Sequence, residues 1–179
     1  MPQIRTLGAA SALVAAGVMV LSSVAVAHPG PHYGPYAFDN VDFLTMDDDD
    51  DYTAPDDSRD KIVGRAGDDE IWSKDKRDLV LGNRGDDEIH GGPGSDLIRG
   101  GRGDDDLYGG EDADKIVGGD GADYIDGGPG RDIIKAGRGD DEIVADDGDR
   151  DLIYCGAGDD TVTADAFDFV SWTCEVVDP

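Results

Sequence analysis

A nine-residue period runs from about residue 55 to residue 163 and constrains the fold more than any other feature of the chain. In GGRGDDDLY, which begins at Gly100, glycine fills the first, second and fourth places, Asp105 the sixth and Leu107 the eighth. Twelve consecutive units keep the sixth-place aspartate, although one of them, ADDGDRDLIY, has ten residues. The twelve are Asp60, Asp69, Asp78, Asp87, Asp96, Asp105, Asp114, Asp123, Asp132, Asp141, Asp151 and Asp160. A tandem period of this length predicts a solenoid whose repeats pack against their neighbours.

The residue types within the unit predict a polar turn followed by a short strand. Glycine adopts positive φ at little cost, so the glycine-rich half can turn sharply and direct its carbonyls to one point. Carbonyl and carboxylate oxygens are the ligands that Ca²⁺ prefers. The eighth place is always Ile, Leu or Val. Because side chains alternate along a strand, we expect the eighth residue to point inward and the seventh and ninth outward.

The units resemble the G-G-x-G-x-D-x-U-x repeats of RTX (haemolysin-type) calcium-binding proteins. The resemblance implies an all-β, parallel β-roll with two units per turn, in which six-residue loops bind Ca²⁺ and three-residue strands form two sheets. It also implies that sixth-place aspartates are calcium ligands. The predicted ligands are Asp69, Asp87, Asp105, Asp123, Asp141 and Asp160 on one side, and Asp78, Asp96, Asp114, Asp132 and Asp151 on the other.

The two sides of such a roll are expected to differ, because alternate units have different loop residues. In the units that carry Asp69 and its equivalents, here the Asp69 series, the fourth place is always glycine and the fifth is mostly acidic. In the alternate units, the Asp60 series, the fourth place varies and the fifth is often arginine. We therefore predict about five stronger calcium sites in the Asp69 series. Two or more weaker sites are expected around Asp96, Asp114 and Asp132.

Charge and composition indicate that cations are part of the fold. The formal net charge is −27 with only 15 Lys and Arg residues, which argues against nucleic acid as a partner. Few aromatic residues and a high negative charge are typical of disorder, and a dozen inward aliphatic side chains make a thin core. Closely packed aspartate loops would also repel one another. The sequence therefore predicts a chain that folds on binding Ca²⁺.

Three segments flank or precede the repeats. Residues 1–27 have the pattern of a secretory signal peptide, with Arg5, an apolar stretch and the small residues Ala25-Val26-Ala27; a retained membrane anchor is the alternative. Residues 28–54, rich in Pro, Gly and Asp, are expected to be flexible. The repeat array is assigned to residues 55–163, and residues 164–179 to a C-terminal cap that includes Trp172. The expected location is extracellular.

The two cysteines are expected to pair if the chain is exported. Cys155 and Cys174 would then form one disulfide that fixes the C-terminal end of the array. Free thiols or a two-cysteine metal site are the alternatives. Neither cysteine has a histidine nearby in the sequence that would make it a nucleophile.

The sequence favours a binding or structural protein over an enzyme. It contains neither G-x-S-x-G nor H-E-x-x-H, and His90 is expected to be an isolated surface residue. Calcium-dependent adhesion or cell-surface interaction is the alternative function. The tripeptide Arg-Gly-Asp occurs three times, each time at the third to fifth places of a unit, where the repeat itself requires the glycine. We therefore interpret it as a product of the repeat and not as an adhesion signal.

The outward positions of the Asp60 series differ from the rest of this acidic chain. Their seventh and ninth places hold apolar and basic residues and no carboxylate. An exposed apolar face commonly marks association, so this surface is predicted to contact a second copy, the N-terminal segment with its run from Asp47 to Asp51, or the cell envelope. The alternative is that these side chains only stabilise a short-stranded sheet. The surface includes Leu79, Leu97, Lys115, Val117, Ile133 and Leu152.

Overall fold

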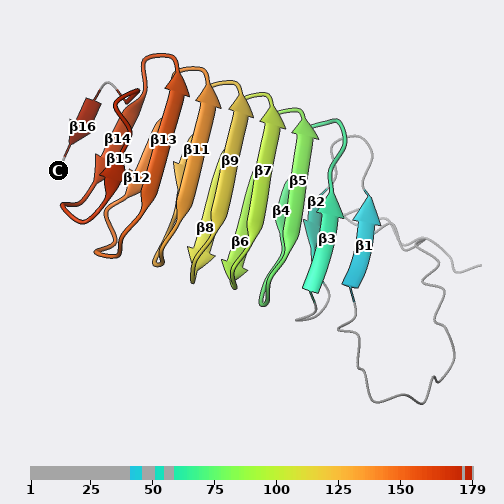
Figure 1. The fold of residues 1–179 in the computed structure, drawn as a ribbon. Helices are drawn as coiled ribbons and strands as arrows, with labels where there is room; N and C mark the ends of the chain where they lie inside the picture. Colours follow the sequence, from blue (N-terminus) through green and yellow to red (C-terminus); the bar gives the residue numbers. More distant parts are fainter. Residues whose placement is uncertain (1–40, 46–50, 55–58, 175, 179) are drawn as a thin grey trace, which may run out of the picture.

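The chain winds into a roll of two parallel β-sheets that face each other (Figure 1). The computed structural model describes residues 41–45, 51–54, 59–174 and 176–178. The proposed signal peptide, residues 1–27, lies outside them, as do residues 28–40 of the segment that follows. The described residues contain no helix, and accordingly none that could cross a membrane. The all-β parallel β-roll with two units per turn is thereby confirmed.

The two sheets are named here after the numbering of their strands. The odd sheet holds β1 (Val41–Thr45), β3 (Arg59–Val63), β5 (Leu79–Arg84), β7 (Leu97–Arg102), β9 (Lys115–Asp120), β11 (Ile133–Arg138), β13 (Leu152–Ala157) and β15 (Phe169–Val170). The even sheet holds β2 (Asp51–Thr53), β4 (Glu70–Trp72), β6 (Glu88–Pro93), β8 (Asp106–Glu111), β10 (Tyr124–Asp126), β12 (Glu142–Ala145), β14 (Thr161–Ala164) and β16 (Val176–Asp178). Units of the Asp60 series supply the odd strands, and units of the Asp69 series the even strands.

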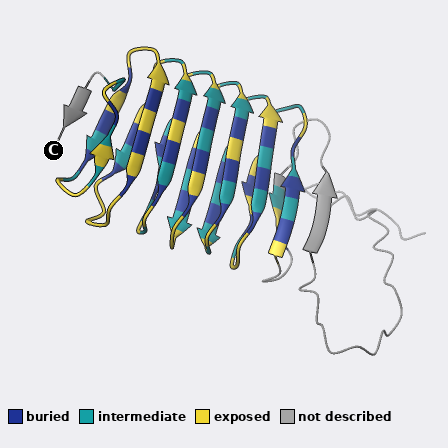
Figure 2. Cartoon of the chain, in the orientation of Figure 1, coloured by how far each residue is buried: buried dark blue, intermediate teal, exposed yellow. Residues whose placement is uncertain are grey.

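The core consists mainly of the eighth-place side chains, which lie in rows between the sheets, together with the first-place residues Ala136, Ala145 and Cys155. Strands pair in register with the strand one turn further on, so that Ile71 lies opposite Ile89 and Ile98 opposite Ile116. These side chains are completely buried. Figure 2 shows the resulting alternation of buried and exposed bands across both sheets. Because every turn repeats the same pairing, the roll keeps its aspartates in straight rows as well.

Several strands are longer than the three residues that the resemblance implied, although β4 and β10 have three. Strand β7 continues through the first three places of the next unit, and Gly101 pairs with Gly119 in the ladder. The adjacent glycines at the first and second places let the backbone stay in the sheet, so the turn is confined to the fourth, fifth and sixth places. Two strands also lie in the segment expected to be flexible: β1 pairs with β3, and β2 with β4. The roll therefore begins before residue 55.

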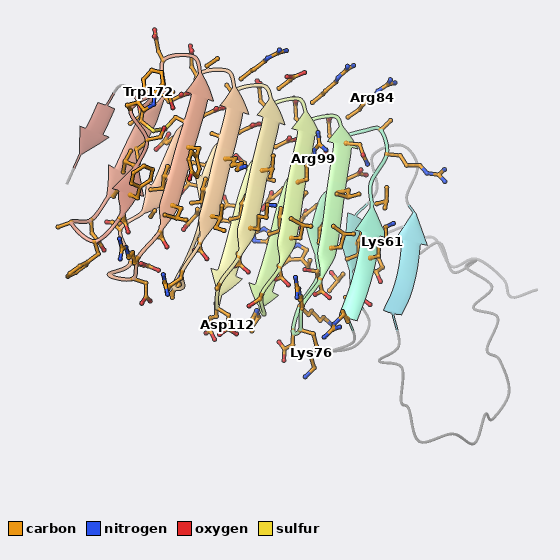
Figure 3. The ribbon with its side chains drawn as sticks, viewed as in Figure 1. Lys61, Lys76, Arg84, Arg99, Asp112 and Trp172 are labelled. Carbon is orange, nitrogen blue, oxygen red and sulfur yellow. A yellow bond between two sulfur atoms is a disulfide. The ribbon has the colours of Figure 1, made fainter. Side chains whose placement is uncertain are left out.

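The C-terminal end of the roll is fixed by the predicted disulfide. Cys155 and Cys174 are bonded, with their Cα atoms 5.2 Å apart, and Cys155 belongs to the buried core. Val170 packs against the same core, and β15 extends the odd sheet beyond the last full unit. Trp172, expected to belong to the cap, is instead 93% exposed and projects from this end (Figure 3). The disulfide and Val170, not Trp172, cover the core here.

Candidate metal centre

Sixth-place aspartates form two buried rows, one at each series of turns. The twelve side chains are between 0 and 3% exposed. In the Asp69 series, Asp87 Oδ1 accepts the backbone N–H of Asp69 at 3.0 Å, and Asp105 Oδ1 accepts that of Asp87 at 2.9 Å. In the Asp60 series, Asp114 Oδ1 accepts the N–H of Asp96 at 2.7 Å. Each carboxylate is therefore held in place by the backbone of the preceding turn.

The second oxygen of nine of these carboxylates has no hydrogen-bond donor in the described structure. In the nine aspartates of the two rows from Asp78 to Asp151, Oδ2 is buried and accepts no hydrogen bond. A buried, unpaired carboxylate oxygen is costly, because it loses its water and gains nothing in return. Such an atom needs either a proton or a cation. The same geometry recurs turn after turn, so the requirement belongs to the repeat and not to one irregular residue.

First-place glycines form a cradle around six of the nine unpaired oxygens. A Cβ added to Gly91 would lie 2.7 Å from Asp96 Oδ2, and one added to Gly109 would lie 2.7 Å from Asp114 Oδ2. The carbonyl oxygen of the next turn's glycine lies against the same positions. Glycine stands at this place in most units, whereas Ser73, Ala136 and Ala145 occupy it before Asp78, Asp141 and Asp151. Carboxylate and carbonyl oxygens around a small space make the donor set that suits Ca²⁺, so the residues present fit that ion.

Burial raises the pKa of the row carboxyls far above the ordinary value of 3.8. The pKa of Asp114 is raised to about 8, and those of Asp96 and Asp105 to about 7. Loss of water on burial is the largest cause in each case. For Asp114, the hydrogen bond from the Asp96 backbone lowers the pKa, whereas the charges of neighbouring row aspartates raise it further. The metal-free rows therefore favour protonated carboxyls, and a bound cation would favour ionised ones.

The Asp69 series has a second carboxylate ladder that the Asp60 series lacks. Asp86 donates its backbone N–H to Asp68 Oδ1, and Asp104 donates to Asp86 Oδ1, both at 2.8 Å. In the Asp60 series two of the fourth places are held by Lys76 and Asp112, which adopt positive φ of 92° and 77° without being glycine. Figure 3 shows both at turns along one edge of the roll. The difference between the series is real, while their division into stronger and weaker sites stays a prediction.

The ten-residue unit brings an additional acid to the row of the Asp60 series. Carboxylate oxygens of Asp132, Asp147 and Asp151 all lie within 4.8 Å of one another. Asp147 is exposed, and its Oδ2 accepts the backbone N–H of Gly130 at 2.8 Å. Asp147 was not among the predicted ligands. The inserted residue was the available signal, but the period alone does not say which side chain the enlarged loop turns inward.

His90 lies in an aromatic row on the outer face of the even sheet. Its ring stacks between Trp72 and Tyr108, with ring centroids 3.6 and 4.5 Å away. His90 Nε2 also lies 2.8 Å from Glu88 Oε1. The residue is therefore only half-exposed and packed, not isolated as expected. No cysteine or second histidine accompanies it among the described residues, since both described cysteines form the disulfide.

A parallel β-roll with buried aspartate rows beside glycine cradles defines a calcium-binding repeat protein. A family model of the RTX calcium-binding nonapeptide repeat matches residues 56–75, 74–107, 81–116, 117–152 and 142–168, which together span more than half of the chain. The chain belongs to this family, and the resemblance is confirmed. The repeats imply a calcium-binding structural module, a fold that is non-catalytic. Comparison with curated proteins and with solved structures finds no match.

Proposed function

We propose that the protein is secreted, folds on binding Ca²⁺ and serves outside the cell as a calcium-dependent binding or structural module. The observation that carries this proposal is the repeated buried Oδ2 atom without a hydrogen bond, found from Asp78 to Asp151. The signal-peptide pattern of residues 1–27 and the disulfide support export, because disulfides persist in oxidising compartments.

The residues that would hold the ions are the eleven predicted aspartates together with glycine carbonyls of the turns. Bound Ca²⁺ would supply the positive charge that lets buried carboxylates stay ionised. The chain's own contribution is positioning: the row hydrogen bonds fix Oδ1, and in most units a first-place glycine lies against Oδ2. About five stronger sites belong to the Asp69 series in this proposal, and two or more weaker ones to the Asp60 series.

Far-UV circular dichroism of the metal-free protein during addition of Ca²⁺ or Mg²⁺ tests this function. We expect a β-sheet spectrum to develop with Ca²⁺ and not with Mg²⁺, because Mg²⁺ keeps its waters and demands a stricter octahedral geometry. The Mg²⁺ titration is the control for charge and ionic strength, since the two ions carry the same charge. A spectrum that is already that of a sheet without metal, and does not change, contradicts the proposal.

Calcium-dependent self-association or cell-surface interaction is a second candidate function. The observation that favours it is the outer face of the odd sheet, which carries Leu79, Leu97, Lys115, Val117, Ile133 and Leu152. Leu152 and Tyr154 are 36 and 41% exposed there. Changing Leu97→Asp together with Ile133→Asp is expected to lower the calcium-loaded mass in light scattering or the retention on cell-envelope material. If neither changes while the fold survives, these side chains only stabilise the sheet.

A further inference from the structure

Charge is sharply segregated between the outer faces of the two sheets. In strands β3 to β13 of the odd sheet, the exposed or half-exposed charged residues are basic except for Asp120. The basic residues include Arg84, Arg99, Arg102, Lys115, Lys135 and Arg138. Strands β4 to β14 of the even sheet contain no Lys or Arg. Their carboxylates are Glu70, Glu88, Asp106, Glu111, Asp126 and Glu142. One roll thus has a basic face and an acidic face on opposite sides.

Both faces repeat with the same spacing, because the same chain winds through them. Neighbouring parallel strands lie about 4.8 Å apart, and in-register pairing puts equivalent places in straight rows. On the even sheet Asp106, Tyr124 and Glu142 are neighbours in such a row. On the odd sheet Lys115 lies between Leu97 and Ile133. A row of one face can therefore be laid along a row of the other without a mismatch in period.

The uncharged residues of the two faces are also complementary. The odd face has a groove of about 550 Å³ over its strands, lined by Arg84, Arg99, Arg102 and Lys135 among others, and Figure 3 shows Arg84 and Arg99 on this side. The even face has the stacked rings of Trp72, His90 and Tyr108. Guanidinium and ammonium groups are attracted to aromatic rings as well as to carboxylates. The even face therefore offers both kinds of partner that the basic side chains favour.

We propose that the calcium-loaded protein binds a second copy of itself face to face, with the odd sheet of one molecule against the even sheet of the other. This inference rests on the proposed function, since both faces exist only in the folded roll. The contact joins two different surfaces, so a stack of any length has an uncovered basic face at one end and an uncovered acidic face at the other. Such a contact does not close, and it produces stacks whose length rises with protein concentration.

Calcium controls this association through the net charge. At −27, metal-free chains repel one another, and each bound Ca²⁺ offsets two negative charges. The contact itself is small: six strands about 4.8 Å apart and roughly 10–20 Å long present roughly 300–600 Å² per face, less than the ~800 Å² per partner of a stable complex. We therefore expect a weak contact that weakens further with added salt, because its ion pairs are exposed.

Two charge-reversal variants of the full chain test the proposal. One carries Arg99→Glu and Lys115→Glu on the odd face, and the other Asp106→Lys and Glu142→Lys on the even face. All four side chains are exposed, and none belongs to the aspartate rows. Circular dichroism with Ca²⁺ first establishes that each variant folds; loss of the β spectrum in the parent protein itself would count against the proposed function, not against the stacking. Sedimentation velocity over a concentration series then measures association.

Each variant alone is expected to associate about tenfold more weakly than the parent, and an equal mixture to recover most of the loss. In the mixture, the odd face of the odd-face variant has become acidic and can contact the even face of the even-face variant, which has become basic. The unchanged acidic even face of the odd-face variant can contact the unchanged basic odd face of the even-face variant. Net charge cannot give this result, because the even-face variant is less negative than the parent and should then associate more. A folded, calcium-loaded parent that stays monomeric at all concentrations overturns the proposal. So does a mixture that shows no recovery, or an odd face that binds only an added anionic polymer.

Discussion

Lowering the pH is expected to stabilise the metal-free roll, the reverse of ordinary acid denaturation. Burial raises the pKa of the row carboxyls, to about 7 for Asp132 and Asp141 and to about 8 for Asp114. In the unfolded chain the same groups have their ordinary pKa near 3.8. A carboxyl with a raised pKa in the fold contributes stability below its unfolded pKa, and this contribution is lost as the pH rises through the folded pKa. Between about pH 4 and pH 8 the metal-free fold therefore weakens as the pH increases.

The size of the effect follows from the pKa values. One pKa unit corresponds to about 1.4 kcal/mol, so a carboxyl with a folded pKa of about 7 costs the metal-free fold roughly 4 kcal/mol at neutral pH. Domains are stable by only about 5–15 kcal/mol, so a few such groups are enough to unfold the chain. Ca²⁺ and protons act on the same oxygens, and we expect calcium affinity to fall as the pH decreases below about 7.

The assay is far-UV circular dichroism of the metal-free protein between about pH 5.5 and pH 8, with urea denaturation at each pH where a β-sheet spectrum is present. The lower limit stays above the isoelectric point of about 4.1, where precipitation would interfere. Asp114→Asn removes one buried titrating group, so it is expected to flatten the pH dependence and stabilise the metal-free fold at high pH while weakening calcium binding. Asp112→Asn, an equal change of charge at an exposed neighbour, is the control.

Two results would refute this reasoning. A metal-free chain that has no more β structure at the lower pH than at the higher one shows that the row carboxyls do not govern folding. If Asp112→Asn changes the pH dependence as much as Asp114→Asn, overall charge repulsion and not burial of the row is responsible.

Three further changes test other parts of the roll. Gly100→Ala puts a Cβ against Asp105 Oδ2 and is expected to destabilise the calcium-loaded fold by about 1–3 kcal/mol in urea denaturation; an unchanged midpoint would contradict the tight cradle. Cys155→Ser with Cys174→Ser is expected to cost about 3 kcal/mol and to expose the C-terminal end to proteolysis first, whereas uniform cleavage along the chain would argue against a local role. Asp147→Asn is expected to weaken one site in calorimetric calcium titration, and identical isotherms would exclude Asp147 as a ligand.

The regular part of the fold could be predicted because the period fixes which way each side chain points. Asp105 and Leu107 stand two places apart in the unit, and both are buried as expected, one in a turn row and one between the sheets. The same alternation holds in every unit, so the orientation predicted for a side chain in one unit is supported by the equivalent side chains of the neighbouring units. Even the disulfide followed from simple chemistry, since two cysteines in an exported chain have one possible pairing.

The features that the sequence did not predict lie where the repeat has no informative side chain or where its spacing changes. The glycine pair carries no side chain that signals a strand, yet Gly101 pairs in the sheet because its backbone N–H and carbonyl meet those of the next turn. Strands β1 and β2 lack the glycines that mark the other units. Asp42 nevertheless pairs with the sixth-place Asp60 and Leu44 with Ile62, while Tyr52 pairs with Ile71 and packs against the core. Asp147 approaches the row only because an inserted residue changes the path of its loop, which depends on contacts between turns.

The Arg-Gly-Asp tripeptides show how strongly these inter-turn contacts govern the sequence. Gly103 has a φ of 121°, and a Cβ there would overlap the carbonyl of Gly85. The middle residue of the tripeptide must therefore be glycine for structural reasons, independent of any binding function. Asp104 Oδ1 accepts the backbone N–H of Ala122 at 2.8 Å, so the acid supports the following turn. Arg102 is free to vary in the repeat, and its guanidinium lies 4.0 Å from Asp120 on the basic face. The glycine and the aspartate of the tripeptide are thus required by contacts between turns, and the recurrence of the tripeptide every eighteen residues or a multiple of that spacing follows from the two-unit turn.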